Sequence, residues 1–227
     1  GNRQYPVNTP GIEVRYFRLL KLNSNGDTLW SNEYGVPTSY NTLRDATQTD
    51  DGGFILVGSQ NYGGGGTQDR NVIMVKIDSL GVQQWIKDIG RRDSLSTSNL
   101  DEQAYAVDQT SDGGYILAGH AWNAITSFNT LLIRTNSLGD TIFTKYLLGS
   151  AGGNSQSVDV QETSDNGYII VEEGYAGSQP AIIKTDIWGN EQWRQQFPEV
   201  KKVYQTPDNG FIILGSTTSF GSGGADI

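Results

Sequence analysis

Residues 48–58 read QTDDGGFILVG, and this stretch decides the fold because it recurs along the chain. The related copies are QTSDGGYILAG at 109–119, ETSDNGYII at 162–170 and QTPDNGFIILG at 205–215. Asp-Gly and Asn-Gly supply the positive φ angles that tight hairpin turns require, and the residues after them favour a strand. Each copy therefore predicts a strand, a turn and a second strand within a repeated unit.

A second pattern alternates with the first. It reads KLNSNG at 21–26, KIDSLG at 76–81, RTNSLG at 134–139 and KTDIWG at 184–189, and each copy is followed four residues later by Trp30, Trp85, Phe143 or Trp193. A turn signal between an apolar run and a strand with one aromatic residue again indicates a hairpin. Each repeat thus contains two hairpins, or four strands.

The pattern of apolar residues predicts how these strands are covered. The second and third strands of the repeats are apolar without alternation, as at 54–57 and 72–75, so both of their faces should be buried. The fourth strand alternates with polar residues, as expected at an exposed edge, and its aromatic residue should pack between repeats. The sequence therefore predicts an all-β fold in which four-stranded antiparallel sheets stack face to face, as the blades of a β-propeller do.

A β-sandwich and a β-solenoid are the alternative folds. A sandwich gives no reason for the repeated sequence, and a solenoid has a shorter repeat. We expect a single β-propeller domain or fragment over 1–227. Its predicted parts are a hairpin at 14–35, blades at about 43–90, 104–149 and 157–197, and a hairpin at 200–217. The two end hairpins could complete a fourth blade, but residues 226–227 look like the start of another strand, which favours a longer propeller.

Composition restricts the partners. The chain of 227 residues has 25 acidic and 16 basic side chains, a net charge of −9, so it should repel nucleic acid. No apolar run reaches membrane-spanning length, and residues 1–10 lack the features of a signal peptide. The absence of cysteine excludes disulfides and thiolate metal sites.

Together, the two motifs resemble the tandem β-propeller repeats of large secreted proteins of Bacteroidota-type bacteria. The resemblance covers nearly the whole chain. In that group such repeats often precede a type IX secretion sorting domain, so the resemblance implies an extracellular or cell-surface location. It implies no catalytic residue, because the motifs specify fold rather than chemistry.

We expect the longer, variable segments between hairpins to carry the binding residues: 59–70, 90–102, 120–129, 149–156 and 173–180. Aromatic side chains beside amides and carboxylates suit a sugar ring, although Trp122 could instead pack within its own loop. The predicted ligand-binding residues are Tyr62, Arg91, Arg92, His120, Trp122 and Tyr175. In addition, Trp188 occupies a hairpin turn where the other repeats have Asn25, Leu80 or Leu138.

The sequence contains no recognisable catalytic motif. His120 is the only histidine and is interpreted as a loop or core residue, since no nucleophile motif accompanies it. The acid pairs Asp101/Glu102 and Glu172/Glu173 are expected to be solvated, because neighbours on a strand face opposite ways.

We therefore predict no catalytic residue, no cofactor and no metal site. Residues 23–27 and 50–52 only faintly resemble a calcium loop, and the hairpin turns already explain their Asp and Gly. The predicted function is a non-catalytic, secreted or cell-surface module that binds protein or polysaccharide or serves as a scaffold. A carbohydrate-active propeller enzyme and a subunit of a surface or secretion assembly are the alternatives.

Overall fold

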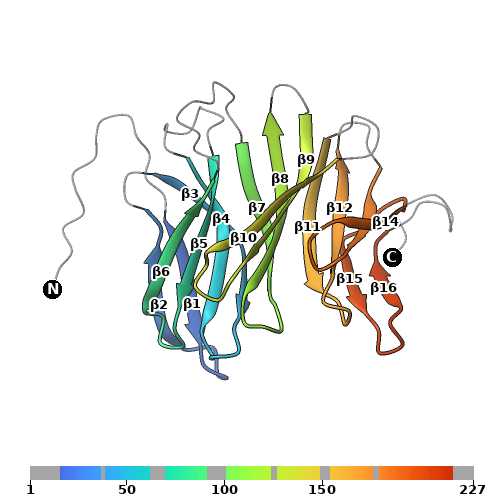
Figure 1. The fold of residues 1–227 in the computed structure, drawn as a ribbon. Helices are drawn as coiled ribbons and strands as arrows, with labels where there is room; N and C mark the ends of the chain where they lie inside the picture. The colour runs from blue at the N-terminus through green and yellow to red at the C-terminus, as the bar shows by residue number, and fades with distance from the viewer. Residues whose placement is uncertain are drawn as a thin grey trace, which may run out of the picture. The chain divides into compact units, whose positions relative to one another are not determined.

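A computed structural model describes residues 16–36, 39–61, 70–90, 101–123, 127–148, 154–175 and 179–216. These residues form strands and turns without any helix (Figure 1). No helix in this part of the chain could therefore cross a membrane. The chain divides into two compact units, Gly1–Glu102 and Gln103–Ile227.

The first unit contains a two-stranded and a four-stranded antiparallel sheet. The two-stranded sheet pairs β1 (Phe17–Leu22) with β2 (Thr28–Tyr34). The four-stranded sheet has the order β3 (Tyr40–Gln48), β4 (Phe54–Asn61), β5 (Arg70–Ile77) and β6 (Gln83–Ile89).

The second unit contains three antiparallel sheets, and its first strand begins two residues before the unit boundary. One sheet consists of β7 (Asp101–Gln109), β8 (Tyr115–Asn123), β9 (Ser127–Thr135) and β10 (Thr141–Leu147). The next consists of β11 (Asn154–Glu162), β12 (Tyr168–Tyr175), β13 (Ala181–Thr185) and β14 (Glu191–Gln196). The last pairs β15 (Lys202–Gln205) with β16 (Phe211–Leu214).

The predicted class, an all-β fold with four-stranded antiparallel sheets, is confirmed. The arrangement of these sheets as a single β-propeller domain stays a prediction. One local prediction was wrong: residues 120–129 were assigned to a loop, whereas β8 and β9 pair through most of this stretch, with His120 opposite Thr130. The error arose because polar residues hid the strand from a search for apolar runs, while the backbone ladder continues regardless of side chain.

Burial follows the predicted pattern. The central strands β4, β5 and β13 are buried along almost their whole length, whereas the fourth strands β6, β10 and β14 are largely exposed or half-buried. In the second unit, Leu132 and Ile170 belong to one core cluster although they lie in different four-stranded sheets. A second cluster contains Val171 and Val203, from the third repeat and the final hairpin. The sheets of this unit therefore stack face to face, and each buried Leu, Ile or Val contributes about 1.5–3 kcal/mol of transfer free energy.

The aromatic residue of the fourth strand links successive repeats, as predicted. A Cβ added to Gly81, which has φ +78°, would lie 3.0 Å from the Trp30 ring. A Cβ added to Gly189, at φ +74°, would lie 2.7 Å from the Phe143 ring. The glycine of the second turn is thus required both by its backbone conformation and by the aromatic ring of the preceding repeat.

Candidate functional site

The first turn of each repeat is built around one aspartate. In the first full repeat, Asp51 accepts hydrogen bonds from the Thr49 hydroxyl at 2.6 Å and the Gly53 amide at 2.9 Å. Lys76 Nζ lies 2.8 Å from its second carboxylate oxygen and is itself almost completely buried. The bond from Lys76, followed by that from Thr49, lowers the pKa of Asp51 to about 2. The carboxylate is therefore held ionised as part of the turn.

The same arrangement recurs in the next two repeats. Lys184 pairs with Asp165 at 2.9 Å, and Arg134 pairs with Asp112 at 2.5 Å. The fourth turn keeps the aspartate, because the Gly210 amide donates to Asp208 at 3.2 Å, but no cation in the described part of the chain contacts Asp208. These cations are thus part of the repeated scaffold rather than free binding groups.

Successive first turns are joined by a hydrogen bond. The Ser111 amide donates to Glu162 Oε2 at 2.7 Å, and the Ser164 amide donates to Gln205 Oε1 at 2.7 Å. The residue before the turn threonine therefore reaches back to the preceding turn. An amide oxygen suffices for this contact, so the negative charge of Glu162 is not needed for it.

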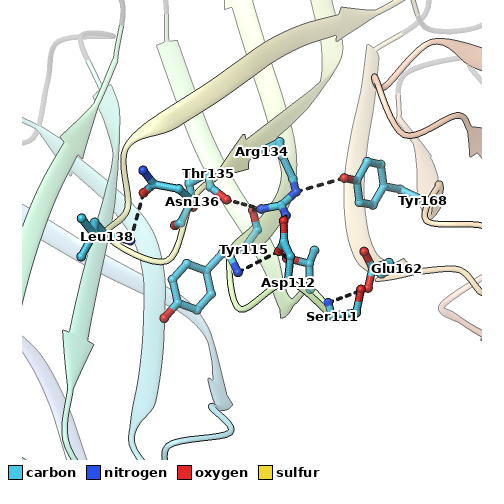
Figure 2. A network of polar contacts seen from close by, with 11 residues as sticks. Ser111, Asp112, Tyr115, Arg134, Thr135, Asn136, Leu138, Glu162 and Tyr168 are labelled. Carbon is cyan, nitrogen blue, oxygen red and sulfur yellow. Dashed lines mark hydrogen bonds and ion pairs between the residues drawn. The ribbon is translucent and has the colours of Figure 1, made fainter.

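Figure 2 shows the network around Arg134, which lies at the turn end of the second and third repeats. Nε donates to the Tyr168 hydroxyl at 3.0 Å, and the Nη2 nitrogen donates to both oxygens of Asp112. The Nη1 nitrogen donates to the carbonyl oxygens of Tyr115 and Thr135. These five contacts match the five N–H groups of a guanidinium.

A cavity of about 250 Å³ opens beside this network. The second repeat contributes its first turn and its fourth strand to the lining. The third repeat contributes its first and second turns. The lining residues are Ser111, Asp112, Arg134, Ile142, Phe143, Glu162, Asn166, Tyr168, Ile187 and Trp188. Trp188 is 63% exposed at the crest of its turn, and Ile187 beside it is 45% exposed. The lining therefore combines apolar side chains and an aromatic ring with carboxylate and hydroxyl groups.

The ionisation of two lining groups is set by their surroundings. Burial raises the pKa of Tyr168, so its hydroxyl stays protonated at neutral pH. Burial also acts to raise the pKa of Asp112, but hydrogen bonds from Gly114, Thr110 and Arg134 lower it overall. Asp112 is therefore a fixed carboxylate and is not suited to donate a proton as a general acid.

Of the predicted ligand-binding residues, the two whose side chains the structure describes, His120 and Trp122, do not line this cavity. His120 and Trp122 lie on β8, and Gln103 Nε2 is 3.3 Å from His120 Nε2 in the core. Tyr175 ends β12, with its side chain outside the described residues. Tyr62, Arg91 and Arg92 also lie outside the described residues, so their predicted binding role stays a prediction.

The expectation that both acid pairs are solvated was wrong for Asp101, Glu102 and Glu172, whereas Glu173 is half-buried and pairs with Lys201. Asp101 and Glu102 are buried, with Arg70 Nη1 at 3.1 Å from Asp101. Glu172 is completely buried, where it accepts from the Thr130 hydroxyl at 3.0 Å and pairs with Arg194. Partners in another sheet or two strands away in the same sheet offset the cost of burying these charges, and a search along one strand could not reveal them.

The segments that faintly resemble calcium loops are occupied by turn bonds. Asn23 Oδ1 accepts from the amides of Asn25 and Asp27, both at 2.9 Å. Among the described residues, no group of three or more His, Cys, Asp or Glu side chains could hold a metal ion.

Three departures from the repeat pattern meet in the cavity. Arg134 stands where the other repeats have Lys, Glu162 where they have Gln, and Trp188 where they have Leu or Asn. Only Trp188 was singled out by the sequence analysis. A position-by-position comparison of the repeats also reveals Arg134 and Glu162. It does not reveal that the three residues line the same cavity. No protein-family model matches the chain, and no match to it is found among curated proteins.

Proposed function

We propose that the chain is composed of β-propeller blades and acts as a non-catalytic binding or scaffold module, with protein or polysaccharide as its partner. The propeller arrangement is supported by the repeated four-stranded sheets and by core clusters that join residues of different sheets within each unit. The proposed location outside the cell or at its surface rests on the resemblance of the repeats.

The observation that carries the binding role is the cavity between the second and third repeats. Elsewhere in the repeats, the side chains that define the repeat motifs form hydrogen bonds and ion pairs with one another within the turns. Here an exposed Trp188 and the additional charge of Glu162 contribute nothing to the turn geometry that Leu or Gln would not. A rigid scaffold with non-scaffold residues at one cavity is typical of a binding site.

An enzyme that cleaves carbohydrate would also need acids in such a cavity, and Asp112 and Glu162 both line it. Asp112, however, accepts from Arg134 through both oxygens, and its lowered pKa leaves it without a proton to donate. The geometry therefore supports binding better than turnover.

Two measurements test this function. A crystal structure in which the sheets pack in any way other than around a common axis would overturn the propeller. Arrays of immobilised oligosaccharides and of extracellular matrix proteins, probed with the purified chain, should show saturable binding to at least one class. Hydrolysis of an array oligosaccharide, abolished by Glu162→Gln, would instead establish the enzyme.

A further inference from the structure

The cavity at the turn end of the second and third repeats has a specific chemistry that narrows its ligand. It contains one cation, Arg134, yet all five guanidinium N–H groups already donate to protein acceptors. An anionic ligand would find no free donor on this side chain and would face two carboxylates. An anion is therefore disfavoured.

A purely apolar ligand is disfavoured by the polar groups of the same wall. Tyr168 is 2% exposed, and its oxygen accepts from Arg134, but no described residue accepts its O–H proton. Glu162 uses Oε2 for the Ser111 amide, while no described residue donates to its Oε1. A ligand that displaced water here without hydrogen bonds would leave a donor and a charged acceptor unpaired.

Three other lining residues are apolar or aromatic. Ile142, Ile187 and Trp188 line the cavity and are 54%, 45% and 63% exposed. The Trp188 amide donates to Asp186 at 2.9 Å, a contact made by the backbone that Leu138 repeats with Asn136. The turn therefore does not require an indole, so the ring is available to cover a ligand.

From this combination we infer that the cavity binds a neutral saccharide ring. One face of the ring would stack on Trp188, while its hydroxyls would donate to Glu162 Oε1 and accept from the Tyr168 O–H. A sugar is the ligand class that offers an apolar C–H face together with hydroxyls that both donate and accept. This inference rests on the proposed binding function and names its ligand class.

The repeats themselves supply the test variants. Trp188→Leu and Glu162→Gln restore residues found at the same positions of other repeats, at Leu80 and Leu138 for the first and at Gln205 for the second. Glu162→Gln keeps an oxygen for the Ser111 amide, as Gln205 does for Ser164. Both variants should therefore fold with an unchanged circular dichroism spectrum.

The purified chain is first applied to an array of neutral, N-acetylated and uronic-acid oligosaccharides. The neutral oligosaccharide that binds most tightly is then titrated into the chain and its variants by isothermal calorimetry. Trp188→Leu should weaken binding about tenfold or more, because the stacking surface is lost. Glu162→Gln should weaken it about threefold to tenfold, because a charge-assisted hydrogen bond becomes a neutral one. The double variant Trp188→Leu/Leu80→Trp moves the exposed indole to another turn and should bind as weakly as Trp188→Leu.

The outcomes separate this inference from the broader function. Suppose that a neutral oligosaccharide binds and that the folded Trp188→Leu and Glu162→Gln variants bind it as tightly as the unmodified chain does. The inference is then wrong, and the proposed binding function belongs to another part of the surface. If Leu80→Trp restores binding to the Trp188→Leu variant, any exposed indole on a turn suffices, and the cavity is not the binding site. If no neutral oligosaccharide binds while a uronic-acid oligosaccharide or a matrix protein does, the ligand class is wrong. If neither array shows binding, both proposals fail.

Discussion

The buried lysine of the third repeat offers a matched test of the scaffold. Lys184 is 6% exposed, and its Nζ lies 2.9 Å and 3.0 Å from the two oxygens of Asp165. Asp208 occupies the same motif position in the fourth repeat, where no described cation contacts it. Asp165→Asn and Asp208→Asn are therefore the same substitution with and without a buried partner.

The expected cost of Asp165→Asn follows from what the amide retains. Its oxygen can still accept from the Thr163 hydroxyl and the Gly167 amide, so the main loss is the charge opposite Lys184. Removing one partner of a fully buried pair costs about 3–5 kcal/mol. Asp165 is 55% exposed and Lys184 keeps the Thr185 carbonyl at 2.8 Å, so we expect about 2 kcal/mol here. Asp208→Asn should leave stability unchanged within error.

Equilibrium unfolding in urea, followed by circular dichroism, measures both variants. Lys184→Met provides the second arm of a double-mutant cycle, because methionine can occupy the site without a charge. In that background the cost of Asp165→Asn should largely disappear. Equal costs for Asp165→Asn and Asp208→Asn, or a cost that persists beside Met, would refute the assignment of the ion pair as the source of stability.

Three further predictions concern the turn aspartates, a close backbone approach and Arg134. The pKa values of Asp51 and Asp165 are lowered to about 2, so their stabilisation should be complete above the unfolded pKa near 4 and be lost as pH falls through 2. After screening of these half-exposed groups this is about 1–2 kcal/mol each, in line with the cost of Asp165→Asn, and it is measurable as a urea midpoint that falls below pH 4, less so in Asp51→Asn. Gly119→Ala places a Cβ 1.8 Å from the Gln103 carbonyl oxygen and should lower the free energy of unfolding by about 3 kcal/mol. The Cβ of Gly113→Ala meets open space, so only its φ of +82° is unfavourable and the loss should be about 1 kcal/mol. Equal shifts of the melting temperature in the two variants would contradict the close approach at Gly119. Arg134→Lys should fold, because the other repeats have lysine at this position. Its free energy of unfolding in urea should fall by about 1 kcal/mol, because the hydrogen bond to the Tyr168 hydroxyl is lost. An unchanged free energy of unfolding would show that this bond is not stabilising.

The hairpins were predictable because their determinants are local. Asp78 Oδ1 accepts from the amides of Leu80 and Val82 at 2.9 Å and 2.8 Å, so the turn is specified within five consecutive residues. The apolar central strands were also predictable, because burial on both faces leaves a continuous apolar run such as 72–75. Strand ends were harder, since polar residues such as Gln60 and Asn61 continue β4 beyond the apolar run.

The burial of polar groups was not predictable from a single strand. Glu172 was expected to be solvated, yet its partners Thr130 and Arg194 lie 42 and 22 residues away. Acidic residues cannot be buried without such partners. Thr130 comes from another sheet and Arg194 from β14, two strands away in the same sheet, so neither can be read from the strand that carries Glu172.

By itself the sequence determined the all-β class, the double hairpin of each repeat and the positions of the turns, because turn chemistry and apolar periodicity act over a few residues. Only the tertiary structure decided that Arg134, Glu162 and Trp188 share one cavity. The first turns that form this cavity are joined by a hydrogen bond between residues 51 positions apart. Such a contact depends on how two sheets pack face to face, and no local pattern encodes that distance.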